Sequence, residues 1–177
     1  MNTVYIVPRE VTQAKLDKRA KAATRHRASQ TYTLSDRVEE SAALYADRPC
    51  ILSNKSQFTY AQTNQHINQV AHAGHALGLK MGDVVGLCME NRPAFLFLWL
   101  GLSKLGVKLV FLNTNVSGKP LAHAIKVTGA NLIVMGEECL GLIDNTELPS
   151  NIQFWLWPDD VNMASASLRD RCALNFE

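Results

Sequence analysis

The sequence predicts an α/β domain with a mostly parallel sheet covered by helices. Beyond Asp83, the short apolar runs VVGLCM, KLVFL and NLIVM alternate with two helical stretches that end at Gly106 and Gly129. The runs are apolar at almost every position rather than at every second one, which is typical of strands buried on both faces. A length of 177 residues suits one compact domain with a sizeable core and is short for two.

The segment before Asp83 begins with a predicted helix and a short hairpin. Residues 33–36, TLSD, open a helix that runs to about Ala46, and Asp47-Arg48-Pro49 ends it. Residues 50–52 and 57–59 are predicted to form the two arms of the hairpin.

A second helix is predicted over residues 60–77. Thr59 is its expected N-cap, because Gln62 stands three residues later as in a capping box, and Gly78 ends it. His72 and His75 lie three apart on this helix but away from its apolar face, with no cysteine or carboxylate nearby in sequence. We expect them to be solvated rather than to bind a metal.

The repeating part of the chain predicts three neighbouring parallel strands joined by two helices. The strands are expected at residues 84–89, 107–112 and 131–135, and the helices at 92–105 and 118–128. The lengths of these segments suit consecutive βαβ units.

The most apolar stretch, Ala94–Leu102, is nine residues long and belongs to the first of these helices. A membrane span needs about 20 such residues, and Lys104 and Lys108 would be costly within a bilayer. Asn91 as N-cap and Pro93 in the first turn are marks of a helix in a globular protein. We therefore expect contacts with the sheet, with neighbouring helices or with a missing part of the molecule from Phe95, Leu96, Leu98, Trp99 and Leu102.

Charge is unevenly distributed along the chain. Residues 1–30 carry seven Lys/Arg against two Asp/Glu, whereas residues 31–177 carry eleven against fourteen. The basic arm, residues 1–30, suits contact with anionic lipid or nucleic acid, but it lacks interleaved aromatics and an apolar stripe. We expect a solvated helix there and no nucleic-acid partner, with peripheral membrane contact left open.

The cysteines and the N-terminus favour a cytoplasmic protein. Cys50, Cys88, Cys139 and Cys172 are scattered without a CxxC pair, so neither a disulfide framework nor a zinc site is predicted. The apolar run VYIV after the N-terminus is too short for a signal peptide.

Few residues suggest chemistry on their own. The loop Asn113-Thr114-Asn115 follows a parallel strand, where α/β proteins usually place ligands, although asparagine is also common in turns. Neither GxGxxG, GxxxxGK[ST] nor GxSxG occurs, and no glycine follows Gly141, so a phosphate-cradling loop is not predicted.

Five pieces in order, covering about residues 30–140, carry a family resemblance. They are FTYAQ opening a helix, GDVVGLCMENRP, WLGLSKLG, FLNTN, and a helix that ends at TGA. Together they resemble the N-terminal region of adenylate-forming enzymes, most of all the fatty-acid transport protein/very-long-chain acyl-CoA synthetase family.

The resemblance implies a two-step fatty acid–CoA ligase that uses ATP, Mg²⁺ and coenzyme A. It also implies that residues 31–177 are part of an AMP-binding N-terminal domain, truncated before the family's phosphate loop and C-terminal domain. No catalytic residue can then be assigned, and the chain alone is expected to be inactive and to bind none of these cofactors. Arg92, Asn113, Thr114 and Asn115 are the candidate substrate-binding residues.

Two alternatives remain open at this stage. One is a stand-alone, non-catalytic module that binds acyl chains or a partner, and the other is an interaction protein built around the basic arm. We also expect self-association through apolar surface around Phe111, Leu112 or residues 152–157, because the parent fold would cover surfaces that this chain leaves bare.

Overall fold

The computed structural model describes residues 8–24, 29, 31–53, 56–144 and 146–158. They fall into two units that divide after Thr33. The first unit contains the helix α1 (Arg9–Ala23), all of whose residues are exposed. The predicted domain boundary after residue 30 stays a prediction.

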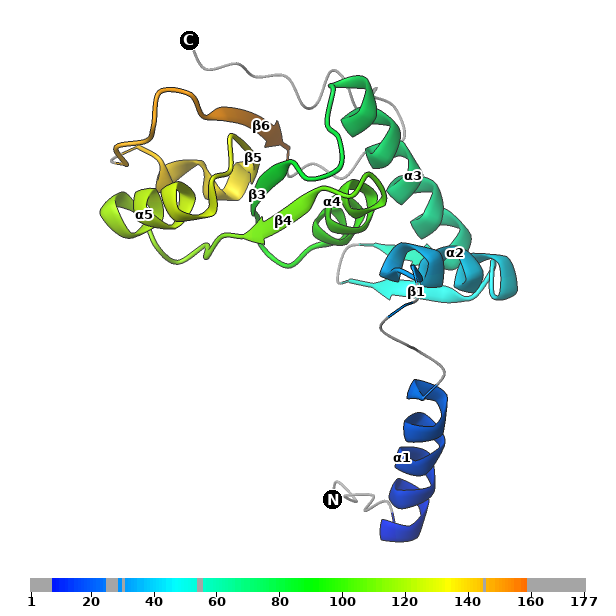
Figure 1. Cartoon of the computed structure of the whole chain (residues 1–177). Helices are drawn as coiled ribbons and strands as arrows, with labels where there is room; N and C mark the ends of the chain where they lie inside the picture. Colours follow the sequence, from blue (N-terminus) through cyan, green and yellow to red (C-terminus); the bar gives the residue numbers. More distant parts are fainter. Residues whose placement is uncertain (1–7, 25–28, 30, 54–55, 145, 159–177) are drawn as a thin grey trace. The chain divides into compact units, whose positions relative to one another are not determined.

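The second unit is an α/β fold (Figure 1). It begins with α2 (Leu34–Leu44), the antiparallel hairpin β1 (Pro49–Leu52) and β2 (Gln57–Thr59), and α3 (Tyr60–Ala76). A sheet of four parallel strands follows in the order β4-β3-β5-β6. Its elements are β3 (Val84–Cys88), α4 (Pro93–Lys104), β4 (Lys108–Phe111), α5 (Gly118–Thr128), β5 (Leu132–Gly136), the 3₁₀ helix η1 (Glu137–Leu142) and β6 (Gln153–Trp157).

The structure confirms the predicted fold class and the three neighbouring parallel strands. It also confirms the capping box, in which Thr59 Oγ1 accepts from Gln62 N at 3.2 Å and Gln62 Oε1 accepts from Thr59 N at 2.9 Å. His72 and His75 are exposed, as expected.

One helix cap differs from the prediction. The N-cap of α4 is Arg92, in extended backbone and without a side-chain cap hydrogen bond, rather than Asn91; Pro93 is the first helical residue, as expected. An arginine side chain carries only donors and so cannot accept from the free N–H groups of the helix; that of Arg92 donates to the end of β6.

The expectation that residues 152–157 form an exposed apolar tail is wrong. Residues 153–157 are β6, which pairs with β5 from Leu132↔Gln153 to Gly136↔Trp157, and Trp157 is 2% exposed. The aromatic side chains are therefore largely explained by burial in the sheet.

The other expected apolar surface, around Phe111 and Leu112 at the end of β4, is only partly present. Phe111 is 49% exposed as predicted, but Leu112 is only 7% exposed. Successive side chains of an extended segment point to opposite faces, so Leu112 turns toward α5 while Phe111 does not.

The sheet is covered on both faces, which accounts for its continuous apolar strands. Leu132 and Val134 of β5 face α3 and α4, whereas Ile133 and Met135 face α5 and η1. Of the α4 residues predicted to make contacts, Leu98 and Leu102 are buried, and Phe95, Leu96 and Trp99 are partly buried. Among the described helices, none combines the length and apolarity that crossing a bilayer requires.

Helices α3 and α4 approach closely at Gly101. A Cβ atom on Gly101 would lie 2.6 Å from Val70 Cβ and 2.7 Å from the Ile67 carbonyl oxygen. A Cβ on Gly74 would instead meet the mobile ends of two leucines, Leu102 Cδ2 at 2.9 Å and Leu105 Cδ1 at 3.0 Å. The backbone contact can be relieved only if one helix moves.

We predict that Gly101→Ala destabilises the second unit by about 2 kcal/mol, because overpacking outweighs alanine's better helix propensity. Gly74→Ala, the matched control, should change the free energy of unfolding by less than about 1 kcal/mol, because leucine ends can adjust. Urea unfolding followed by tryptophan fluorescence measures both. Equal losses at the two positions would contradict the role given to the Gly101 contact.

His66 of α3 packs between two phenylalanines. Its ring stacks on Phe97 with centroids 4.8 Å apart and meets Phe58 edge-on at 5.3 Å. Burial lowers the pKa of His66, although the hydrogen bond to Gln69 partly opposes this effect.

Because the pKa of His66 is lower in the folded chain than the value of about 6.5 in the unfolded chain, the unfolded chain binds more protons as the pH falls below that value. The free energy of unfolding should therefore decrease between about pH 7 and pH 5. His66→Phe should flatten this decrease, and His75→Phe on the exposed side of the helix should not. Unchanged pH dependence in His66→Phe, measured by urea titration at each pH, would argue against this assignment.

Candidate functional site

Arg92 joins three strand ends at the carboxyl edge of the sheet. It lies between β3 and α4, and its Nη1 donates to the Pro158 carbonyl oxygen at 3.0 Å. Its Nη2 donates to the Trp157 carbonyl oxygen at 3.2 Å and to Glu138 Oε2 at 3.0 Å. The guanidinium therefore connects the end of β3 to the end of β6 and to η1, which follows β5.

Glu138 completes this arrangement, which we call the Arg92–Glu138 clamp. Its Oε1 accepts from the Glu90 backbone N–H at 2.9 Å, so the carboxylate contacts both ends of the segment that leads into α4. The side chains of Arg92 and Glu138 are 15% and 19% exposed. A Cβ on Gly136 would lie 2.6 Å from Glu138 Cδ, so the carboxylate occupies space that only glycine leaves open.

Two buried thiols lie beside the clamp. Burial, together with smaller effects of the neighbouring Cys139 and Glu138, raises the pKa of Cys88 to about 12. The pKa of Cys139 is also raised, mainly by burial and by Glu138. Both thiols stay protonated at neutral pH, so neither is suited to be a nucleophile or a metal ligand. Across the residues that the structure describes, no group of three or more His, Cys, Asp or Glu could hold a metal ion; Cys172 lies outside them.

The candidate loop 113–115 lies at the same edge, after β4. Asn113 Oδ1 accepts from Asn115 N at 2.9 Å and from Asn115 Nδ2 at 3.3 Å, so the loop closes on itself as an Asx turn. Asn113 and Asn115 are exposed, and Thr114 is half-buried. Arg92 and this loop thus follow adjacent parallel strands, as expected, but these hydrogen bonds of Asn113 stay within the loop.

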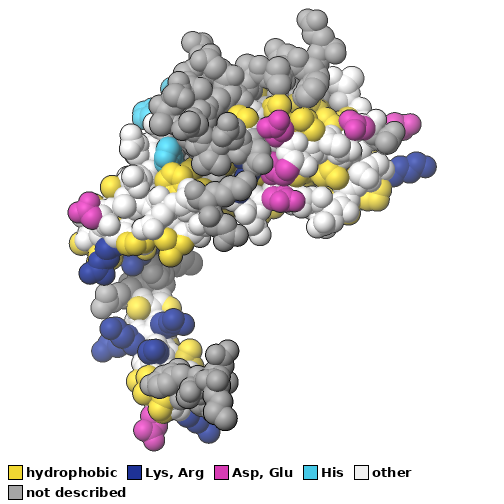
Figure 2. All heavy atoms as spheres, turned by 180° about the vertical axis from the view of Figure 1, so that it is seen from behind, with side chains coloured by type: hydrophobic (Ala, Val, Ile, Leu, Met, Phe, Trp, Pro, Cys, Tyr) yellow, Lys and Arg dark blue, Asp and Glu magenta, His cyan; other side chains and the backbone are white. Residues whose placement is uncertain are grey.

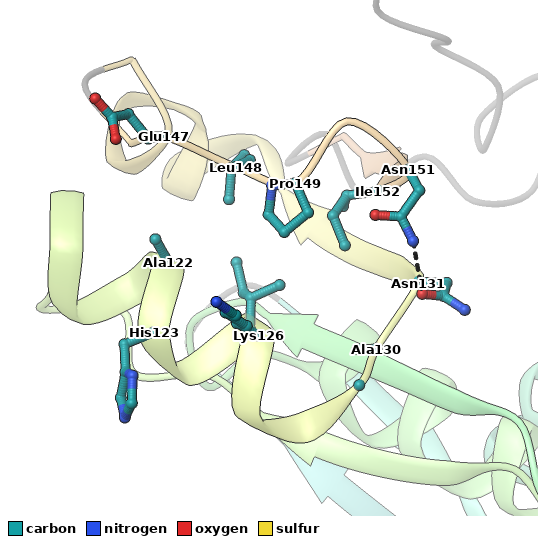
Figure 3. A pocket seen from close by; sticks show the side chains of 12 residues that line it. Ala122, His123, Lys126, Ala130, Asn131, Glu147, Leu148, Pro149, Asn151 and Ile152 are labelled. Carbon is teal, nitrogen blue, oxygen red and sulfur yellow. Dashed lines mark hydrogen bonds between the residues drawn. The ribbon is translucent and has the colours of Figure 1, made fainter.

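A hollow of about 530 Å³ lies at the opposite end of the sheet, between α5 and the segment before β6 (Figure 3). Lys126 and Glu147 contribute its charged side chains, and Asn151 Nδ2 donates to Asn131 Oδ1 at 3.2 Å on its rim. Because Asn131 precedes β5 and Asn151 precedes β6, this hollow is at the amino ends of the strands. Ligands of open α/β sheets bind at the carboxyl ends, so the clamp and the 113–115 loop remain the better candidate site.

Residues 38–165 match the model of the family described as AMP-binding enzyme. The chain belongs to the AMP-binding enzyme family. The match includes all of the sheet and both parts of the candidate site.

Relatives in sequence include long-chain fatty acid transport proteins. The human protein 6 is 33% identical over 143 residues, which are 78% of this chain and 23% of that protein. The rat protein 2 is 42% identical over 100 residues, 56% of this chain and 16% of that protein. The chain therefore spans about a quarter or less of the length of these relatives.

Among solved structures, the N-terminal domain of FACL13 from Mycobacterium tuberculosis superposes with a TM-score of 0.68 and 25% identity, over 81% of this chain and 37% of that one. The resemblance to the N-terminal region of adenylate-forming acyl-CoA synthetases is thereby confirmed, as is the fold class.

Sequence reasoning selected Arg92 but missed its partner Glu138. The signal was available, because EE follows the strand LIVMG and so places two carboxylates at the carboxyl edge of the sheet, where Arg92 also lies. What a single sequence could not reveal is that one of these carboxylates turns back over Gly136 to reach the arginine.

We predict that Glu138→Gln destabilises the second unit by about 2–3 kcal/mol, because it removes a carboxylate that offsets the charge of the mostly buried Arg92 guanidinium. Gly136→Ala should cause a similar loss by displacing the same carboxylate, and the double variant should cost little more than either change alone. Glu147→Gln, at an exposed carboxylate, should stay within about 0.5 kcal/mol of wild type. Urea unfolding measures all four, and full additivity would contradict a shared mechanism.

Proposed function

We propose that this chain is the N-terminal part of an ATP-dependent long-chain or very-long-chain fatty acid–CoA ligase. The observation that carries the proposal is the family match over residues 38–165, supported by the names of the relatives and by the fold. In the intact enzyme a fatty acid carboxylate would displace pyrophosphate from ATP to give an acyl-adenylate. The thiol of coenzyme A would then take the acyl group and release AMP.

The described residues do not fit ATP or Mg²⁺. The carboxyl edge of the sheet offers one guanidinium already paired with a carboxylate, and the described residues hold no acidic cluster for a cation. Glycines whose backbone could approach a triphosphate are absent after Gly141. We therefore infer that the chain alone is inactive and that the intact enzyme binds its cofactors elsewhere.

This chain would contribute the sheet and would hold the candidate substrate-binding residues in place. The clamp fixes the ends of three strands, and that edge carries the 113–115 loop on the neighbouring strand. A fatty acid carboxylate near this edge would meet the amide groups of Asn113 and Asn115, with Arg92 beyond them. Arg92, Asn113, Thr114 and Asn115 remain our candidate substrate-binding residues on this ground. We place the protein in the cytoplasm, with peripheral membrane contact.

An aromatic trio with one half-exposed ring favours the alternative of a stand-alone acyl- or partner-binding module. Phe111 lies 5.1 Å from Phe95 and 5.4 Å from Trp99 between ring centroids, beside the sheet edge formed by β4. Phe111 is 49% exposed, so the trio offers apolar surface to an acyl chain or to a second copy of the chain.

The test compares residues 1–177 with a longer polypeptide from the same gene that continues through a C-terminal domain. With a long-chain fatty acid, ATP, Mg²⁺ and coenzyme A, we predict pyrophosphate release from the longer polypeptide and none from residues 1–177. Release by the short chain would contradict its inactivity. Failure of the longer polypeptide with every fatty acid tried would contradict the ligase.

A separate measurement addresses the alternative. Fatty acid binding by residues 1–177, with quenching of tryptophan fluorescence that Phe111→Ser weakens, would favour the stand-alone module. Light scattering of the same two samples shows whether the trio also drives self-association.

A further inference from the structure

The helix α1 carries the most strongly charged surface of the described chain. Figure 2 shows dark-blue side chains gathered on it, and none of its residues is buried. Its sequence, REVTQAKLDKRAKAA, holds five cations and two carboxylates. Within the second unit, by contrast, acidic residues outnumber basic ones in the sequence.

The cations of α1 are not spread evenly around it. At 100° per residue, Lys15, Lys18 and Arg19 fall within an arc of about 100°. Asp17 points away from this arc, and its Oδ1 accepts from Gln13 Nε2 at 2.8 Å on that other side. We call Lys15, Lys18 and Arg19 the basic face of α1.

This arrangement is unfavourable for a helix in water. Lys15 repels Lys18 three residues later and Arg19 four residues later, and like charges at these spacings destabilise a helix. A helix of 15 residues is also marginal without a packed face, and α1 has no buried residue and no side-chain cap at its N-terminus. An anionic surface against the basic face would offset the repulsion among these three cations and would thereby stabilise the helix.

The chemistry of the neighbouring side chains distinguishes lipid from nucleic acid. The helix contains no aromatic residue on which a base could stack. Val11 falls inside the basic arc and is 44% exposed. Leu16 lies just outside the arc, next to Arg19, and is 49% exposed. These two exposed apolar side chains do not form an apolar stripe, so the contact with lipid headgroups is mainly electrostatic, with a small apolar contribution from them and from the lysine stems.

We propose that the basic face of α1 docks on a bilayer surface that contains anionic phospholipid. The contact is peripheral and electrostatic, so it weakens as the salt concentration rises. It does not rest on the ligase proposal, because it uses residues outside the matched region 38–165.

The test is co-sedimentation of the 177-residue chain with large unilamellar vesicles. One set contains three parts phosphatidylcholine to one part phosphatidylserine, and the other contains phosphatidylcholine alone. We expect binding only to the first set, lost at high salt. Circular dichroism should show added helix with the first set only, because the bilayer relieves the repulsion within α1.

The triple variant Lys15→Gln, Lys18→Gln, Arg19→Gln removes the basic face while keeping residues of similar helix propensity. Each lost charge should lower the vesicle partition coefficient about five-fold, and the three together on the order of 100-fold. The matched control, Lys80→Gln, Lys119→Gln, Lys126→Gln, removes the same charge from exposed lysines of the second unit and should bind nearly as well as wild type.

Each other result would overturn the proposal. Equal losses in the two triple variants would mean that net charge, not the basic face, decides binding. Tighter binding to an RNA or duplex DNA oligonucleotide than to the phosphatidylserine vesicles would assign the face to nucleic acid. Self-association that the α1 variant abolishes, without vesicle binding by wild type, would assign it to a second copy of the chain.

Discussion

The contact between α4 and α3 at Gly101 is the constraint on which the second unit depends. Helix α4 shares one buried core with β3, β5 and β6, and its side that bears Phe97 and Gly101 must also be covered because it is apolar. Only a glycine lets the backbone of α3 come close enough to provide that cover. The hairpin β1–β2 and the ring of His66 pack onto the same layer, so their positions follow from this approach.

At the carboxyl edge of the sheet, two charged side chains are paired with each other. The Arg92–Glu138 clamp neutralises itself and places both groups among backbone partners, at the ends of strands that belong to one sheet. A guanidinium held in this way is oriented and cannot turn freely toward a multiply charged ligand. Because its positive charge is already offset, the clamp is poorly suited to holding a triphosphate.

Much of this architecture could be predicted, because it rests on local signals. Continuous apolar runs, separated by helices that end at glycines, specified β3, β4 and β5, and Thr59 with Gln62 specified the start of α3. The strand β6 was missed although the turn Pro149-Ser150-Asn151 precedes it, because its pairing with β5 is a long-range choice that local signals do not specify. Glu138 was missed for a related reason: its direction is set by the space above Gly136, which only the folded chain defines.

The strand order β4-β3-β5-β6 has a consequence for how the chain is made. The inner strand β3 leaves the ribosome before either of its neighbours, and β5 leaves before β6. Every hydrogen bond of this sheet therefore waits for segments synthesised later, while α4, the most apolar helix of the chain, is already outside the exit tunnel. During that interval the nascent polypeptide presents an uncovered apolar surface, which makes it a natural client for chaperones that act at the ribosome.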